Sequence, residues 1–187
     1  FIQKKQKLVP FRGPFNSNVL GSNEDGVREI MFNDKFGFKN KNTVYQDKID
    51  LMIIGDSFTE GVPFGNDIHV ANLINNESNY NALNYGVSGT GPLMSLAIVK
   101  EYGKHFNPKD IFYLFYEGND LTDMMNEKET FLINYLENDN FHQNLIGNSE
   151  QLNDFFDEYE QVFYNIINYQ KKNLSTINNI DIEKKSE

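Results

Sequence analysis

Three continuous apolar runs constrain the fold of this chain more than any other feature of its sequence. They are DLMIIG at residues 50–55, ALNYG at 82–86 and DIFYLFY at 110–116. None of them alternates apolar with polar residues, and unbroken runs of this length are typical of strands covered on both faces in a parallel sheet. We therefore expect three parallel strands, buried on both faces, at the centre of the fold.

Helical patterns fill the two intervals between these runs. The segment DIHVANLIN, residues 67–75, places Val70, Ala71 and Ile74 on one face of a helix. A second helix is expected with Pro92 in its first turn, where the missing N–H of proline costs no hydrogen bond. Strands that alternate with helices predict βαβ units with right-handed crossovers.

These patterns predict a three-layer α/β/α sandwich with a flavodoxin-like parallel sheet and the strand order 2-1-3. Residues 1–48 are polar and punctuated by glycine, and we expect them to form an N-terminal extension with short strands or a hairpin, as a lid or an edge. Residues 49–187 form the main domain. Helical spacing continues at FLINYL, residues 131–136, and from Leu152 onward, but no fourth strand is indicated. Because three strands leave an open edge, we expect the domain to need further strands beyond this chain.

Charge and composition exclude several classes of partner. The chain has 17 Lys and Arg against 27 Asp and Glu, and this net charge of −10 repels phosphate backbones and anionic lipid, so no nucleic-acid partner is expected. It has no cysteine, which excludes disulfides and thiolate metal sites. Its apolar runs are too short for a membrane span. The first residue is Phe rather than Met, so the sequence leaves open whether a signal peptide lies upstream. Localisation stays open for the same reason: cell envelope or secreted with such a signal, and otherwise cytoplasmic. Oligomeric state is not indicated.

Each of the three apolar runs is followed by small and polar residues of the kinds found in catalytic and binding sites. In an open parallel sheet, reactive groups collect where the strands end, because loops and helix N-termini point N–H groups into a crevice there. We therefore expect one site to gather the residues that follow the runs: Gly55-Asp56-Ser57, Gly86-Val87-Ser88-Gly89 and Glu117-Gly118-Asn119-Asp120.

At these residues the chain resembles the SGNH hydrolases, also called the GDSL esterase and lipase family. GDSFTEG matches the first block of the family, NYGVSGTGP the second with its glycine at Gly89, and YEGND the third with its asparagine at Asn119. The blocks follow in family order between residues 50 and 123. The upstream FNDKFGFKN is also similar to a segment of bacterial members that act on envelope or polysaccharide substrates.

The resemblance implies hydrolysis of a carboxylic ester, with Ser57 as the nucleophile. The backbone N–H groups of Ser57 and Gly89 and the side-chain amide of Asn119 would stabilise the oxyanion. The implied substrate is a small-molecule or glycan ester, with an O-acyl group on a carbohydrate favoured, and no metal or organic cofactor is implied. Asp56 is expected to shape the turn by accepting a hydrogen bond from a following N–H group.

Other interpretations of the same residues stay open. Ser57 and Asn119 could simply be helix caps, and the glycines of GVSGTG could be loop residues with positive φ. A phosphate site at GVSGTG is less favoured, because this segment lacks the lysine of a P-loop. The same serine could serve acyl transfer, with a sugar hydroxyl replacing water. From a different class, the domain could be a non-catalytic glycan-binding or scaffold protein.

The base that would take the proton of Ser57 is the missing part of this pattern. The family places Asp-x-x-His after its last strand, where the His is the base and the Asp orients it. His69 and His105 are expected to be solvated surface residues. Asp139 and His142 have the right spacing, but they follow the third block too soon and lie in a loop-like segment. We therefore predict that His142 does not bond to Ser57, and that the true Asp and His lie beyond this chain.

Overall fold

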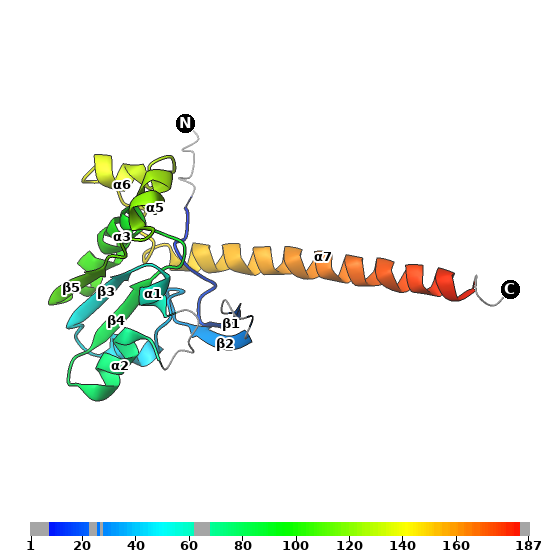
Figure 1. Ribbon diagram of the computed structural model, residues 1–187, viewed down its shortest axis with the longest axis horizontal. Helices are drawn as coiled ribbons and strands as arrows, with labels where there is room; N and C mark the ends of the chain where they lie inside the picture. The colour runs from blue at the N-terminus through cyan, green and yellow to red at the C-terminus, as the bar shows by residue number, and fades with distance from the viewer. Residues whose placement is uncertain (1–7, 23–25, 27, 62–67, 184–187) are drawn as a thin grey trace. The chain divides into compact units, whose positions relative to one another are not determined.

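The computed structural model describes residues 8–22, 26, 28–61 and 68–183 of the 187-residue chain. The chain divides into two compact units, Phe1–Ser149 and Glu150–Glu187. The first unit contains all the strands found among the described residues. The second is formed by the greater part of one long helix, α7 (Ser149–Glu183), which the helical spacing from Leu152 onward predicts (Figure 1).

A three-stranded parallel sheet forms the centre of the first unit. Its strands are β3 (Leu51–Gly55), β4 (Ala82–Gly86) and β5 (Asp110–Leu114), in the order β4-β3-β5. The three apolar runs and the order 2-1-3 are thus confirmed. Gly55 pairs with Gly86 on one side and with Leu114 on the other, so the three strands end together at one edge.

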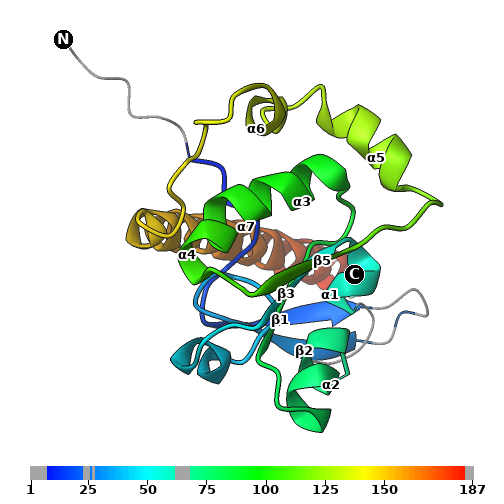
Figure 2. The ribbon, with the colours of Figure 1, turned by 90° about the vertical axis from the view of Figure 1, so that its left-hand side faces the viewer.

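Helices cover both faces of this sheet, as the predicted α/β sandwich requires. The chain crosses from the central β3 to β4 on one side, and then from β4 past β3 to β5 on the other side. Because these two crossovers run in opposite directions and both are right-handed, their helices must lie on opposite faces of the sheet. Figure 2 shows α2 and α3 on opposite sides of the sheet. The helices of this unit are α1 (Ser57–Glu60), α2 (Val70–Glu77), α3 (Pro92–Ile98), a π-helical turn (Val99–Gly103), α4 (Lys104–Phe106), α5 (Asp120–Glu127) and α6 (Ile133–Glu137), with a 3-10 turn at Asn42–Gln46.

The first residues of α3 and α2 differ in how well the sequence predicts them. Pro92 is at the start of α3, as its position in the sequence predicts. In α2, Ala71 is fully buried, but Val70 is exposed, so the expectation that Val70 shares the buried face is wrong. The reason is that α2 begins at Val70 itself, whereas the predicted helix began three residues earlier, at a part of the chain outside the described residues.

The N-terminal segment contains the expected hairpin, β1 (Ser17–Ser22) paired antiparallel with β2 (Arg28–Asn33). The residues after it are part of the core. Phe38 is completely buried, with its ring centroid 4.1 Å from that of Tyr85 on β4 and 5.2 Å from that of Tyr102. The polar composition of this segment gave no sign of that burial.

Asn40 closes the outer edge of β4 by imitating a neighbouring strand. Its side-chain amide donates to the carbonyl of Asn84 at 2.9 Å and accepts from the N–H of Asn84 at 2.7 Å. Asp34 holds Asn40 in this position through a 2.8 Å bond to the same amide, and it also accepts from the N–H groups of Phe36 and Phe38. The edge strand therefore has its backbone groups satisfied at this point.

Asn40→Ala should lower the free energy of unfolding by about 1–3 kcal/mol, because a buried N–H and a buried carbonyl of Asn84 lose their partners. Urea denaturation would measure the loss. Asn42→Ala is the matched control, since Asn42 also bonds through both side-chain atoms but is exposed. An equal loss in the two variants would contradict the role given to Asn40.

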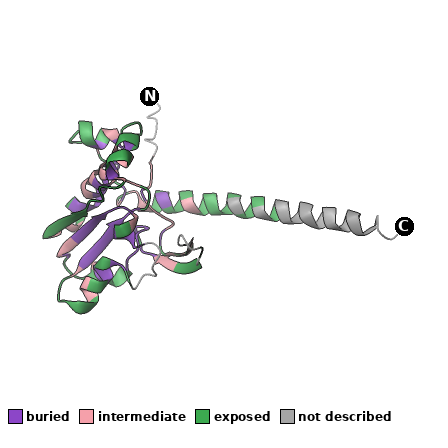
Figure 3. Ribbon diagram, in the orientation of Figure 1, coloured by how far each residue is buried: buried purple, intermediate pink, exposed green. Residues whose placement is uncertain are grey.

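The strand β5 departs from the expected burial. Phe112 is 52% exposed, and the other residues of β5 are exposed too, in contrast to the fully buried β4. Figure 3 shows the same contrast along the sheet. The prediction that all three runs are covered on both faces is therefore wrong for β5 among the described residues. β4 is an edge strand too, but Phe38 and Asn40 cover it, whereas within the described residues the apolar surface of β5 stays exposed and could take another element.

Candidate active site

The three blocks meet at the carboxyl edge of the parallel sheet. Ser57 follows β3, Gly89 lies in the loop after β4, and Asn119 lies in the turn after β5. In the strand order β4-β3-β5 the chain goes from β3 outward to β4 and then back past β3 to β5, which makes the gap between β3 and β5 the switch point at which ligands bind in open α/β sheets. All three residues are at least partly exposed.

Ser57 is the first residue of α1, and Asp56 is the residue that caps this helix. The Asp56 Oδ1 atom accepts a hydrogen bond from the N–H of Phe58 at 2.9 Å, which confirms the predicted role of Asp56 in the turn. Neither the hydroxyl nor the N–H of Ser57 has a hydrogen-bond partner within the described part of the chain. The alternative in which Ser57 is merely a helix cap is therefore wrong.

The end of β4 lies unusually close to α1. A Cβ atom on Gly86 would come within 2.2 Å of the backbone nitrogen of Glu60, so only glycine permits this approach. Gly89 has φ of +72°, in the left-handed region that favours glycine, although a Cβ atom there would meet nothing within 4 Å. Conformation is thus the reason for glycine at position 89, as the interpretation of this glycine as a loop residue with positive φ predicts.

Most backbone donors in the loop after β4 already have acceptors. The N–H of Val87 bonds to the carbonyl of Gly55 at 2.9 Å, and that of Ser88 to the carboxylate of Glu60 at 2.8 Å. The N–H of Gly91 bonds to the carboxylate of Glu127 at 2.7 Å. In the residues that the structure covers, the N–H of Gly89 has no acceptor. Gly89 can therefore donate to an incoming oxygen.

Asn119 occupies the N-cap position of α5, but its side chain makes no capping bond. Instead its Nδ2 atom donates to the Oδ2 atom of Asp123 at 2.8 Å, which leaves the second amide hydrogen for another acceptor. The capping alternative for Asn119 is therefore wrong as well. Next to it, Asp120 accepts from the N–H of Tyr116 and the hydroxyl of Tyr113, each at 2.9 Å, and burial together with this carboxylate raises the pKa of Tyr113.

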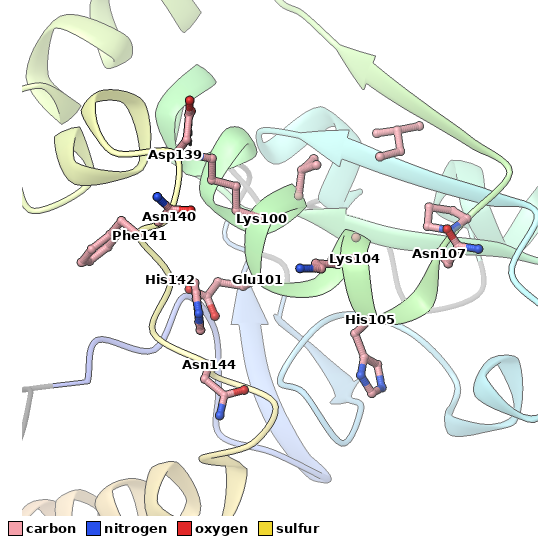
Figure 4. A pocket seen from close by; sticks show the side chains of 14 residues that line it. Lys100, Glu101, Lys104, His105, Asn107, Asp139, Asn140, Phe141, His142 and Asn144 are labelled. Carbon is pink, nitrogen blue, oxygen red and sulfur yellow. Dashed lines mark ion pairs between the residues drawn. The ribbon is translucent and has the colours of Figure 1, made fainter.

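His142 lies away from this edge. It lines a cavity of about 850 Å³ together with most of residues 99–108 and with Ile111, near the start of β5 (Figure 4). Ser57 follows the end of the five-residue β3, and at about 3.3 Å per residue the two edges of the sheet are about 13 Å apart. Within the described ranges, no hydrogen bond joins His142 to Ser57 or to Asp139. The exposed Asp139 instead forms an ion pair with Lys100, at 3.7 Å.

The other two histidines differ from each other. His105 is exposed, as predicted, and lines the same cavity as His142. His69 is buried, so its expected surface role is wrong. Its Nδ1 atom accepts from the N–H of Asn72 at 3.2 Å and caps α2, and its Cβ atom lies 2.6 Å from the place that a Cβ on Gly61 would occupy. Histidine is not among the residues that commonly cap helices, so no sequence signal indicated this role.

Three features beside the site were not foreseen from the sequence. Lys39 is buried, donates to the carbonyl of Gly61 at 3.0 Å, and has its pKa lowered to about 8 by that burial. Phe58 and Tyr116 form an exposed aromatic pair next to Ser57, with ring centroids 4.8 Å apart. Glu60 is a buried carboxylate directly beneath the second block.

Comparison with family models, with curated proteins and with solved structures found no match for this chain. The described residues include no cluster of three or more His, Cys, Asp or Glu side chains placed to hold a metal ion. None of the helices in the described part of the chain has the length and apolar character needed to cross a membrane.

Proposed function

We propose that this chain carries the nucleophile and oxyanion site of a serine hydrolase of the SGNH type, which acts on carboxylic esters. Ser57 attacks the acyl carbon, and the N–H groups of Ser57 and Gly89 with the amide of Asn119 bind the oxyanion. The observation that carries this proposal is that these donors are unused. Asn119 stands at the N-cap position of α5 and Ser57 directly after the N-cap of α1, yet neither side chain caps its helix. The N–H groups of Ser57 and Gly89 lack acceptors in the described structure.

The favoured substrate is an O-acyl group on a carbohydrate. The exposed pair of Phe58 and Tyr116 supports this choice, because the face of an aromatic ring suits the apolar face of a sugar or an acyl chain. Small esters and lipids are related substrates. Acyl transfer to a sugar hydroxyl uses the same serine and the same donors.

A non-catalytic glycan-binding or scaffold role is the second candidate function. The observation that favours it is that no imidazole bonds to Ser57 among the described residues, and a serine without a base keeps its proton at neutral pH. Added imidazole, which can act as an external base, separates the two functions.

Covalent capture by a fluorophosphonate tests the proposal on this chain. In buffer with imidazole, the Ser57 oxygen should attack phosphorus and fluoride should leave, so that one adduct maps to the peptide with Ser57. Ser57→Ala should remove the adduct, while Ser78→Ala keeps it, because Ser78 lies at the end of α2 and donates its hydroxyl to the carbonyl of Ile74. An adduct that stays in Ser57→Ala, or no adduct at all, would argue for the scaffold role.

A further inference from the structure

Glu60 and Arg12 take no part in the proposed chemistry, yet they meet directly beneath the second block. Glu60 ends α1, three residues after Ser57, and is only 1% exposed. Its Oε2 atom accepts hydrogen bonds from both the N–H, at 2.8 Å, and the hydroxyl of Ser88. Its Oε1 atom forms an ion pair with the guanidinium of Arg12. One carboxylate thus connects the first block, the second block and the N-terminal segment.

This contact fixes the backbone just before Gly89. On the far side of Gly89, the carboxylate of Glu127 accepts from the N–H groups of Gly91, at 2.7 Å, and Leu93, at 2.9 Å. The loop is therefore held by a carboxylate on each side of the one glycine with φ of +72°. A donor for an oxyanion must be held in place before the reaction, since reorientation during the reaction would cancel its benefit.

The side chain of Glu60 is not needed to hold α1 itself. The backbone of Glu60 does that, because its N–H donates to the carbonyl of Asp56 at 3.0 Å and its carbonyl accepts from the side chain of Asn84 at 3.3 Å. The close approach at Gly86 adds backbone packing at the same place. The carboxylate adds the two hydrogen bonds that it accepts from Ser88.

We infer that Glu60 is a positioning residue that aims the Gly89 N–H at the oxyanion, and that Arg12 makes this role possible by neutralising Glu60. Without Arg12, the buried carboxylate of Glu60 would be an uncompensated negative charge in contact with Ser88, the residue before the oxyanion donor Gly89. It would repel the negative charge that develops in the transition state. This inference rests on the proposed function. It also makes the segment around Arg12 a part of the active-site framework.

Replacing Glu60 and Arg12 together distinguishes a role of Glu60 in positioning Gly89 from a role in the stability of the fold alone. Glu60→Met leaves the partly buried Arg12 without its partner, and the unfolding midpoint should fall. The combination Arg12→Met with Glu60→Met should restore the midpoint, because buried ion pairs can be replaced by apolar side chains of similar size. Both variants should lower the kcat for Ser57-dependent hydrolysis of p-nitrophenyl acetate in imidazole by about 100-fold, with KM changed by less than about two-fold, because Ser88 has lost its acceptor.

Glu101→Met is the matched control. Glu101 is another buried carboxylate, which accepts from Tyr135, Gln143 and Leu145, so its loss should lower the midpoint and leave kcat unchanged. If the double variant regained kcat together with its midpoint, or if Glu101→Met lowered kcat equally, Glu60 would be a structural residue only.

Amide spectra of the ¹⁵N-labelled chain keep this test separate from that of the proposed function. In the double variant, the amide signals of Ser88 and Gly89 should move, and the Ser88 N–H should lose its protection from exchange. If wild type shows Ser57-dependent turnover but these signals stay unchanged in the variant, the inference alone is overturned. If wild type shows no such turnover, the proposed function fails, and the catalytic role of Glu60 fails with it.

Discussion

Ser57→Ala should abolish the imidazole-dependent turnover of p-nitrophenyl acetate, a loss of at least about 10³-fold relative to wild type. The reason is that covalent catalysis requires the hydroxyl, while the donors of Gly89 and Asn119 that remain can stabilise only attack by water. The free energy of unfolding should change by no more than about 1 kcal/mol, because the Ser57 side chain is partly exposed and has no partner in the described structure.

His142→Ala is the control for this experiment. Because His142 lines a cavity near the opposite edge of the sheet, its loss should change the Ser57-dependent rate by less than about two-fold. Rates would be measured with the reaction in imidazole alone subtracted. A Ser57→Ala variant that keeps its rate would show that Ser57 is not the nucleophile, and a large loss in His142→Ala would make His142 a candidate base after all.

The sheet could be predicted from the sequence because its signals are local. Each strand lies within one apolar run, and β3 and β4 both end at a glycine. That Ser57, Gly89 and Asn119 follow strands with a common edge is a consequence of topology, since parallel strands paired in register end at the same edge. The role of Asp56 was predictable for the same reason, because its partner is only two residues away.

The features that could not be predicted depend on partners far apart in the sequence. Glu60 bonds to Ser88, 28 residues later, and Asn40 bonds to Asn84, 44 residues later. In the sequence, Glu60 is one charged residue in a short helix, and nothing local indicates that it is buried. The exposure of β5 was not predicted for a related reason. An apolar run shows that a strand has apolar side chains to bury, but it does not show whether other elements of the fold cover them.

The same reasoning explains why the N-terminal segment was expected to be peripheral, although it completes the framework of the site. Arg12 pairs with Glu60, Lys39 bonds to Gly61, and Asn40 closes the edge of β4. These contacts reach the first and second blocks from residues that precede both of them. The segment should therefore be required for the activity of the site, and its central anchor is Phe38.

Phe38→Ala should lower the free energy of unfolding by about 3–5 kcal/mol, because the ring is fully buried against Tyr85 and Tyr102 and its removal leaves a cavity. Chemical denaturation followed by circular dichroism would measure this change. Phe58→Ala is the matched control, since Phe58 is 65% exposed and its loss should cost no more than about 1 kcal/mol. A small effect in Phe38→Ala would mean that the segment can detach from the sheet without unfolding the core, and that the lid expected from its composition is the better description.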